Sequence, residues 1–166
     1  MNIVLIGMPG TGKSTTGVIL AKKLGMDFID TDILFKSKVG KTVPQIISER
    51  GIDGFLEAEG EIGASIDCDN TVIATGGSMV LSSQAMTNLS RGGVIVWLDT
   101  DVAELTKRIE ADLKQRGVAA ADGMTVSDIF AEREPYYEKY ADFRISCHGS
   151  IAQTVNELMA IAAKFT

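Results

Sequence analysis

The sequence has no excess of positive charge. Its 166 residues include 16 lysines and arginines against 22 aspartates and glutamates, which gives a formal net charge of -6. Proteins that bind nucleic acids normally carry a basic stripe, and proteins that bind anionic membrane surfaces carry a polybasic segment. We therefore expect neither a nucleic acid nor a membrane among its partners.

Long apolar runs and targeting segments are missing as well. The longest apolar runs, such as residues 94–98, are far too short to span a bilayer. No basic and apolar leader with a small-residue cleavage site precedes the first predicted strand. The two cysteines, Cys68 and Cys147, lack the spacing of metal ligands, and we interpret them as buried small side chains or idle thiols. These absences predict a cytoplasmic protein.

Internal repeats, low-complexity segments and interdomain linkers are also absent. The composition, 45% hydrophobic and 23% charged, is that of an ordinary globular protein. A chain of 166 residues is long enough to bury a core of its own. We therefore expect a single domain over residues 1–166, and we expect it to be a monomer.

What the sequence does contain is an alternation of strand and helix patterns. Short apolar runs predict five buried strands, at residues 2–6, 26–30, 71–77, 92–99 and 143–147. Helical periodicity, capping residues and terminal glycines predict helices at residues 14–24, 33–39, 43–50, 55–66, 101 to about 115, 125–140 and from 150 onward. This order predicts an α/β fold, a five-stranded parallel sheet with helices on both faces.

The stretch GMPGTGKST, residues 7–15, is the first chemical signal. It contains the pattern G-x-x-x-x-G-K-[ST] between a predicted strand and a predicted helix, which is the context of a phosphate-binding loop. Its glycines permit a tight turn whose N–H groups point at phosphate oxygens, beside the positive end of the helix. Lys13 can reach the β- and γ-phosphates, and the Ser14 hydroxyl suits Mg²⁺. The residues predicted to bind ATP here are Gly10, Thr11, Gly12, Lys13, Ser14 and Thr15.

Further polar and glycine residues follow the next two predicted strands. Asp30 and Asp32 come at the end of the second strand, and Gly76 and Gly77 come after the third. Ligands of open parallel sheets bind beyond the carboxyl ends of the strands, so these residues are expected to meet the phosphate loop at one edge. One carboxylate could hold the hydration shell of Mg²⁺, and the other could orient an acceptor hydroxyl or accept its proton. The glycines would form a wall that a ligand can approach closely.

With these motifs in place, the chain resembles the shikimate kinases over almost its whole length. The resemblance rests on the phosphate loop and on FIDTD, GKTVPQII, ATGGS, VWLD and AEREPYYEKYAD. The last segment, with its Arg-x-Pro core, is a more specific marker than the loop. The resemblance implies a P-loop fold of the nucleoside-monophosphate-kinase type. It also implies transfer of the γ-phosphoryl group of ATP, with Mg²⁺, to a hydroxyl of shikimate.

The resemblance also implies roles for single residues. Asp30 would serve Mg²⁺ together with Ser14, and Asp32 would contact the acceptor hydroxyls. Arg133 in REPYY would be one of two arginines that clamp the substrate carboxylate, beside the glycine wall of Gly76 and Gly77. Lys13, Asp32 and the lid arginine would carry the catalysis.

The lid itself is predicted from a stretch without periodicity. RGVAAADGM, residues 116–124, is rich in small residues and lies beside the inferred phosphate site, which predicts a mobile lid at about residues 112–124. By resemblance, Arg116 is the arginine that closes over the phosphates of ATP.

The family pattern fails in three places. FLEAE stands where the family has Phe-Arg-x-x-Glu, so Leu56 replaces the other carboxylate-binding arginine, while Glu59 matches the glutamate that could brace an arginine. Ser78 replaces the third glycine of Gly-Gly-Gly, and residues 117–119 replace the proline and leucines of the lid. A hydrogen bond to a charged group contributes about 1.5–3 kcal/mol, so the lost arginine should weaken carboxylate capture unless another cation, such as Arg50, substitutes.

Two other functions therefore stay open at the level of the sequence. The first is the same chemistry on a different small hydroxylated acceptor, because Leu56 could make room for a less acidic or more apolar compound. The second is a nucleotide-binding regulatory module that binds ATP without turnover because its acceptor site has decayed. The phosphorylated product, if any forms, distinguishes these two functions from phosphorylation of shikimate.

Overall fold

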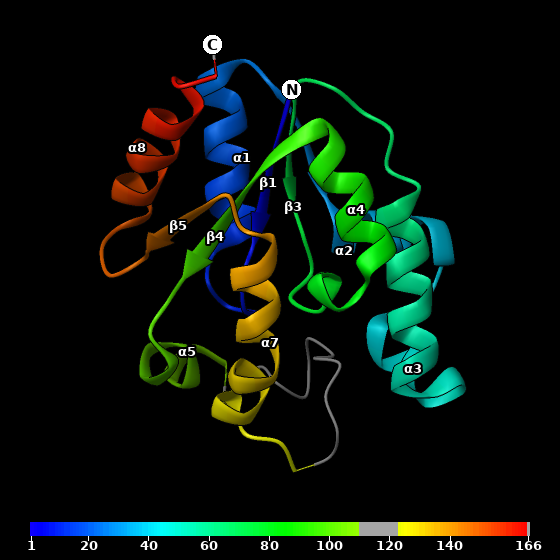
Figure 1. The fold of residues 1–166 in the computed structure, drawn as a ribbon. Coiled ribbons are helices and arrows are strands. Elements are labelled where there is room, and N and C mark those ends of the chain that lie inside the picture. The colour runs from blue at the N-terminus through cyan, green and yellow to red at the C-terminus, as the bar shows by residue number, and fades with distance from the viewer. Residues whose placement is uncertain (110–122, 166) are drawn as a thin grey trace.

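The computed structural model describes residues 1–109 and 123–165, and its centre is one parallel sheet (Figure 1). The strand order is β2-β3-β1-β4-β5, and every neighbouring pair is parallel. The strands are β1 (Asn2–Ile6), β2 (Asp27–Asp30), β3 (Thr71–Ala74), β4 (Gly93–Asp99) and β5 (Phe143–Ser146). The predicted α/β fold with five parallel strands is confirmed.

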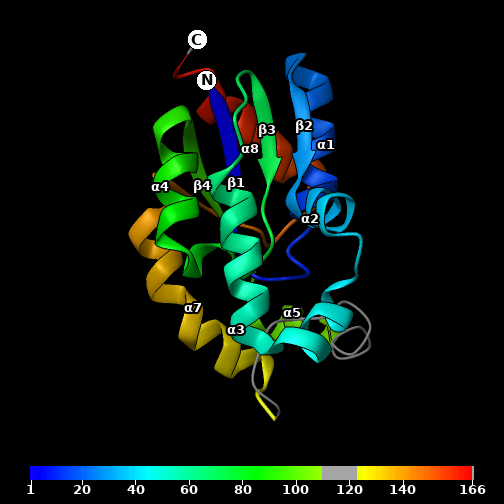
Figure 2. The same ribbon diagram turned by 90° about the vertical axis from the view of Figure 1, so that its right-hand side faces the viewer.

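Helices cover both faces of this sheet, as Figures 1 and 2 show. In the order of the chain, the described helices are α1 (Lys13–Leu24), α2 (Thr31–Val39), α3 (Val43–Ala64), the 3-10 turn η1 (Met79–Leu81), α4 (Ser83–Gly92), α5 (Val102–Ile109), α7 (Val126–Tyr140) and α8 (Ile151–Ala162). α1 and α8 pack on one face, whereas α4 and α7 lie on the other. That the chain is a single domain and a monomer stays a prediction.

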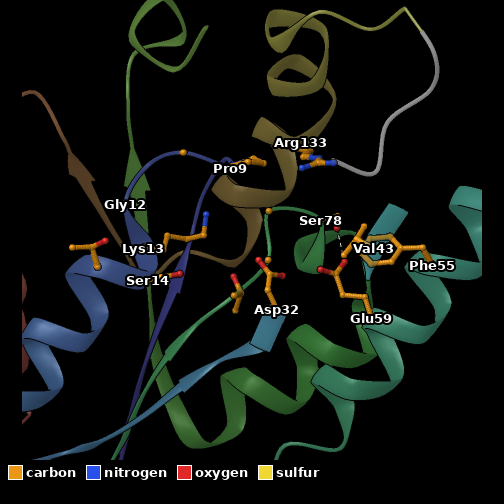
Figure 3. Close-up of a pocket in the computed structure, with 15 residues that line it drawn as sticks. Pro9, Gly12, Lys13, Ser14, Asp32, Val43, Phe55, Glu59, Ser78 and Arg133 are labelled. Atoms are coloured by element: carbon orange, nitrogen blue, oxygen red, sulfur yellow. Dashed lines mark hydrogen bonds between the residues drawn. The ribbon is translucent and has the colours of Figure 1, made fainter. Parts of the chain in front are cut away.

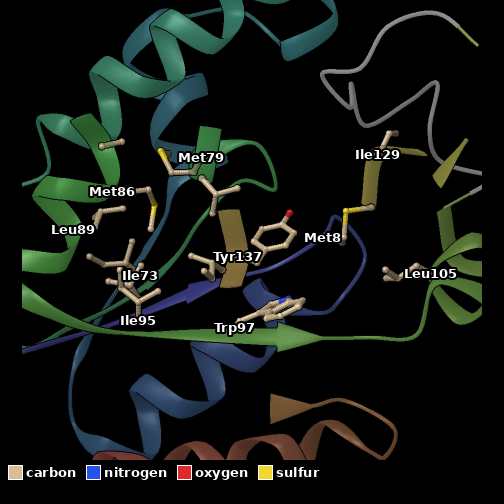
Figure 4. Packing of buried hydrophobic residues seen from close by; sticks show 14 of the residues in the cluster. Met8, Ile73, Met79, Met86, Leu89, Ile95, Trp97, Leu105, Ile129 and Tyr137 are labelled. Atoms are coloured by element: carbon tan, nitrogen blue, oxygen red, sulfur yellow. The ribbon is translucent and has the colours of Figure 1, made fainter. Parts of the chain in front are cut away.

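Alternation along β1 explains the two layers of the core. Val4 and Ile6 belong to the cluster under α4 and α7, whereas Ile3 and Leu5 belong to the cluster under α1 and α8. Successive side chains of a strand point to opposite faces, so a strand that is buried on both sides must be apolar throughout. Figure 4 shows the first of these clusters around Trp97 and Tyr137.

Glycines and capping residues end and start the helices where the sequence predicts. Gly25 and Gly40 close α1 and α2 in the left-handed conformation. Thr125 and Ser150 begin α7 and α8, each within a capping box. The predicted break at Gly51 is also present: its φ of 72° and ψ of 176° bend α3, which continues to Ala64 as one kinked helix.

The sequence pattern did not predict α4. Its side chains are mostly Ser, Gln, Thr, Asn and Arg, and only Ala85, Met86 and Leu89 are buried. Ser82 caps it by accepting a hydrogen bond from the backbone N–H of Ala85, at 3.2 Å. Ala85, Met86 and Leu89 share one face of the helix, but only three of the ten residues supply the apolar surface, so α4 depends on its cap and on packing against α3 and β4.

A small satellite cluster lies apart from the two layers of the main core. Phe35 of α2 meets Phe55 of α3 edge to face, with 5.3 Å between the ring centroids, and Ile46, Ala58 and Ile62 complete the cluster. It packs α2 against α3, while Leu34 of α2 also reaches the main core. None of the helices in residues 1–109 and 123–165 has the length and apolar character that a membrane span requires.

Candidate phosphoryl-transfer site

A pocket of about 250 Å³ opens at the carboxyl ends of the central strands (Figure 3). Segments from the phosphate loop, α2, α3, the turn after β3 and α7 line it. The predicted site residues that line it are Gly10, Gly12, Lys13, Ser14, Thr15, Asp32, Gly76, Gly77 and Arg133. Arg116 and residues 112–122 of the predicted lid lie outside the described residues.

The phosphate loop has the expected left-handed glycines. Gly10 and Gly12 have φ values of 82° and 87°, which side chains with a Cβ rarely adopt, and Gly12 leads directly into α1. The ammonium of Lys13 donates to the carbonyl oxygens of Gly7 and Met8, at 2.8 and 2.7 Å, and Thr11 lies beside it. Burial lowers the pKa of Lys13 to about 8, although Asp32 opposes the shift. A buried cation at a helix N-terminus suits a polyanion such as triphosphate.

Ser14 and Asp30 meet at one side of the loop. The Ser14 hydroxyl donates to Asp30 Oδ2 at 2.5 Å. Asp30 Oδ1 caps α2 by accepting from the N–H groups of Asp32 and Ile33, so the carboxylate is fixed with its other oxygen toward Ser14. Hydroxyl and carboxylate oxygens are ligands that Mg²⁺ accepts. No group of three or more His, Cys, Asp or Glu among the described residues could hold a metal ion alone, so a cation here would need oxygens from phosphate or water.

Two carboxylates form the opposite wall. Figure 3 shows Asp32 between Lys13 and Glu59. A Cβ at Gly76 would clash with both Glu59 Oε1 and Asp32 Oδ1, so the glycine lets both carboxylates approach the turn. Burial raises the pKa of Asp32, and the charge of Asp30 adds to the rise. Burial also raises the pKa of Glu59, to about 7.

Arg133 is buried in the pocket and is not a surface charge. It is 2% exposed, and a Cβ at Gly77 would lie 3.0 Å from its Nη1. One turn later on α7, the Tyr137 hydroxyl donates to the Gly77 carbonyl at 2.8 Å, and the Tyr137 ring stacks on Trp97. α7 is thereby tied to the glycine turn, which places Arg133 against the pocket.

The residues that depart from the family pattern lie at the edge of this pocket. Leu56 does not line it: its half-buried side chain packs on the satellite cluster and faces a side groove. Arg50 does not substitute for the missing cation, because its guanidinium lies 3.7 Å from the exposed Glu57 carboxylate. Ser78 lines both the pocket and the groove, and its hydroxyl donates to Glu59 Oε2 at 2.5 Å.

Sequence reasoning missed several other residues of the pocket wall. Pro9, Val43 and Phe55 line the pocket. Phe55 and Glu59 are four residues apart, so they share one face of α3, and that spacing was a usable signal.

A second pocket, which the sequence did not predict, adjoins the outer side of the loop. Arg108 of α5 lines it and donates from Nη1 to the Gly10 carbonyl at 3.1 Å. Its other walls include Thr100, Cys147 and His148 at the carboxyl ends of β4 and β5.

Comparisons with known proteins agree with this geometry. The sequence model of the family described as shikimate kinase matches residues 9–163. A shikimate kinase of Symbiobacterium thermophilum is 37% identical over 164 residues, which cover 96% of this chain and 94% of the relative. The structure of a shikimate kinase from Acinetobacter baumannii in complex with shikimate superimposes with a TM-score of 0.88 at 28% identity, covering 99% of this chain and 94% of that one. For the shikimate kinase of Aquifex aeolicus the TM-score is 0.82 at 27% identity, with 96% and 95% covered.

Proposed function

The chain belongs to the shikimate kinase family, and on that premise we propose that it transfers the γ-phosphoryl group of ATP to a hydroxyl of shikimate. One observation carries the proposal: Lys13, Asp32 and Arg133, from three distant parts of the chain, line one pocket at the carboxyl edge of the sheet. The first would bind phosphate, the second the acceptor hydroxyl and the third the acceptor carboxylate.

The phosphate end of the pocket would hold ATP. The loop N–H groups and Lys13 would bind the β- and γ-phosphates, and Gly10 to Thr15 would surround them. Ser14 and Asp30 would hold Mg²⁺ together with phosphate oxygens and water. When bound, the cation supplies positive charge that neutralises the phosphates. Lys13 would add charge that stabilises the phosphoryl group during transfer, because it is fixed before the reaction begins.

The second pocket is where we place the nucleoside of ATP. Arg108 joins its wall to Gly10, so a triphosphate on the loop can extend directly into it. The Oγ1 of Thr100 is buried in this wall beside the Cys147 thiol, a weak hydrogen-bonding group, so a polar edge of the base could offer it a stronger partner.

Asp32 and Arg133 would orient the acceptor. A carboxylate beside the phosphoryl group can align the attacking hydroxyl and accept its proton, and the raised pKa of Asp32 brings its basicity closer to that task. Arg133 can pair with a carboxylate through two parallel N–H donors. The roles of Arg116 and of the lid stay predictions from the sequence.

The two other functions are less well supported. A decayed acceptor site would not be expected to keep Asp32, Glu59 and Arg133 in one pocket, and the similarity to shikimate kinases covers nearly the whole chain. The similarity to shikimate kinases over nearly the whole chain also favours shikimate over a different acceptor.

Product formation tests the proposal. The purified protein should consume ATP and form shikimate 3-phosphate when MgATP and shikimate are both present, and Asp32→Asn should lower kcat by about 100-fold or more, since general-base catalysis contributes roughly that much. Other hydroxy acids and uncharged polyols serve as comparison substrates. ATP binding without any phosphorylated product, or a preference for another compound, would reject shikimate as the substrate.

A further inference from the structure

Glu59 and Ser78 are polar residues that line the pocket and that the roles above do not use. Glu59 is 5% exposed and Ser78 is 6% exposed, so water reaches neither side chain freely. Ser78 donates to Glu59 Oε2, the dashed line in Figure 3, while Glu59 Oε1 lies against Gly76 on the same wall as Asp32.

The number of protons on this pair decides what it can donate. When Glu59 is ionised, the pair holds one proton, and the Ser78–Glu59 hydrogen bond uses it. When Glu59 is neutral, the pair holds two protons, and one is spare for a third group. A neutral pair can therefore donate a hydrogen bond into the pocket, whereas an ionised pair offers only lone pairs and a negative charge.

The charges around the pair make this distinction matter. The charged groups that act on Glu59 are Asp32 of α2, Arg133 of α7 and Lys13 of the loop. Glu59 in turn acts on Tyr137 of α7. Asp30, at the end of β2, acts through Asp32. Among the described residues that line the pocket, Lys13 and Arg133 are the cations, and Lys13 lies at the phosphate end. Leu56 is uncharged. An ionised Glu59 would therefore place a negative charge opposite the acceptor carboxylate, and Arg133 would be the nearest positive charge to offset the repulsion.

We propose that the neutral Ser78–Glu59 pair is the second carboxylate-recognising group of the acceptor subsite, donating its spare proton to the acceptor carboxylate opposite Arg133. The inference rests on the proposed function, because it assumes a carboxylic acid as the acceptor. It also links two departures from the family pattern: Leu56 removes a cation, and Ser78 supplies Glu59 with a hydrogen-bond partner.

The proposal predicts a pH dependence with a definite sign. Burial raises the pKa of Glu59 to about 7, and the charge of Asp32 adds to the rise, while the Ser78 hydrogen bond, Arg133 and Lys13 oppose it. Below that pH the pair is neutral and can donate, and above it the pair is ionised and repels. The KM for shikimate should therefore rise by roughly tenfold between pH 6 and pH 8, following the ionised fraction of one group.

The test is the KM for shikimate at saturating MgATP across this pH range. In Glu59→Gln, whose amide is always neutral and keeps an N–H donor, KM should stay near its low-pH value up to pH 8. Glu61→Gln is the matched control, because Glu61 is exposed on the same helix, and it should keep the wild-type rise. A flat profile in the wild type, or an unchanged rise in Glu59→Gln, would overturn the inference.

Ser78→Ala gives a second, independent readout. The Ser78 hydrogen bond lowers the pKa of Glu59, so its loss should move the rise in KM to higher pH. If the role of Ser78 were purely structural, Ser78→Ala would change KM by the same factor at every pH. That result would also contradict the proposed role of the Ser78–Glu59 pair. Failure of the two proposals is distinguishable: no shikimate-dependent turnover at pH 6 would reject both, whereas turnover with a flat profile would reject only this one.

Discussion

At the scale of single residues, Lys13 is a cation that burial has already separated from water. Only a small part of its surface is exposed, and backbone carbonyls of the loop hold its ammonium. Such a group needs little reorganisation to bind phosphate, which is why it contributes more than a surface lysine.

We predict that Lys13→Ala lowers turnover by about 100-fold or more, the cost of losing one preorganised donor to the transferring group. The fold should persist, because burial disfavours the charged form of Lys13 and its removal relieves that cost. ATP binding by calorimetry and kcat measure the effect. Lys22→Ala, an exposed lysine on the same helix, is the control, and equal behaviour of the two variants would contradict the assignment.

Leu56 faces the side groove that shares Ser78 with the pocket, and the longer side chain of an arginine at this position would extend past Ser78 toward the acceptor. Leu56→Arg should then raise kcat/KM for shikimate by roughly tenfold or more, since a charge-assisted hydrogen bond contributes about 1.5–3 kcal/mol. An arginine here would also pair with Glu59 and keep it ionised, so the rise of KM with pH should become smaller. Leu56→Met, which keeps the apolar volume, is the control. Wild-type kinetics in Leu56→Arg would show that position 56 does not limit carboxylate capture.

Single residues differed in how far the sequence could predict them. Lys13 and Ser14 were predictable because the loop that positions them is local. The burial of Arg133 and the Ser78–Glu59 bond were not, because each depends on how α7 or α3 packs against the turn after β3. Nineteen residues separate Ser78 from Glu59, and no pattern in the chain couples them.

At the scale of elements, the contact between α7 and the glycine turn sets the acceptor side of the pocket. Tyr137 makes it with both its hydroxyl and its ring, one helical turn after Arg133.

Tyr137→Phe removes the hydroxyl and keeps the ring. The hydroxyl bonds both the Gly77 carbonyl and Arg133, so its loss should cost about 1–3 kcal/mol at roughly 0.5–1.5 kcal/mol per hydrogen bond, and a chain of this size loses about 2–4 °C in Tm per kcal/mol. We expect KM for shikimate to rise several-fold, in line with that energy, with a smaller change in kcat. Tyr136→Phe, whose side chain is 39% exposed, should change neither quantity. A loss of Tm without a change in KM would show that the bond does not position Arg133.

Elements were predictable where their ends carry a chemical marker. Gly25, Gly40 and Gly51 marked helix ends because they adopt left-handed φ values that other residues avoid. The start and end of α4 are less clearly marked in the sequence. Its cap is one of several serines in this stretch, and only three residues form its apolar face. Tertiary packing supplies what its sequence lacks.

At the scale of the whole molecule, ligand binding and stability are linked. At a concentration 100 times its Kd, MgATP should stabilise the fold by about 2.7 kcal/mol, because it binds only the folded state. That corresponds to a rise in Tm of roughly 5–11 °C for a chain of this size. Thermal unfolding with and without MgATP measures the shift, and Lys13→Ala should lose most of it. A shift of equal size in Lys13→Ala would place the nucleotide elsewhere.

The number and direction of the strands followed from the alternation of strands and helices, but their order did not. Parallel connections must cross over the sheet, and which side each crossover takes is decided by packing between distant segments. The result places β1 in the middle, between β3 and β4.

That central position has a consequence for biosynthesis. β1 leaves the ribosome well before its two partners, which are residues 71–74 and 93–99. At translation rates of about 5–20 residues per second, roughly 5–20 s pass before both partners have been made. For that time a five-residue segment that is fully buried in the finished protein has no sheet to join. The nascent chain is therefore most exposed to aggregation, and most dependent on chaperones, before the end of β4 emerges.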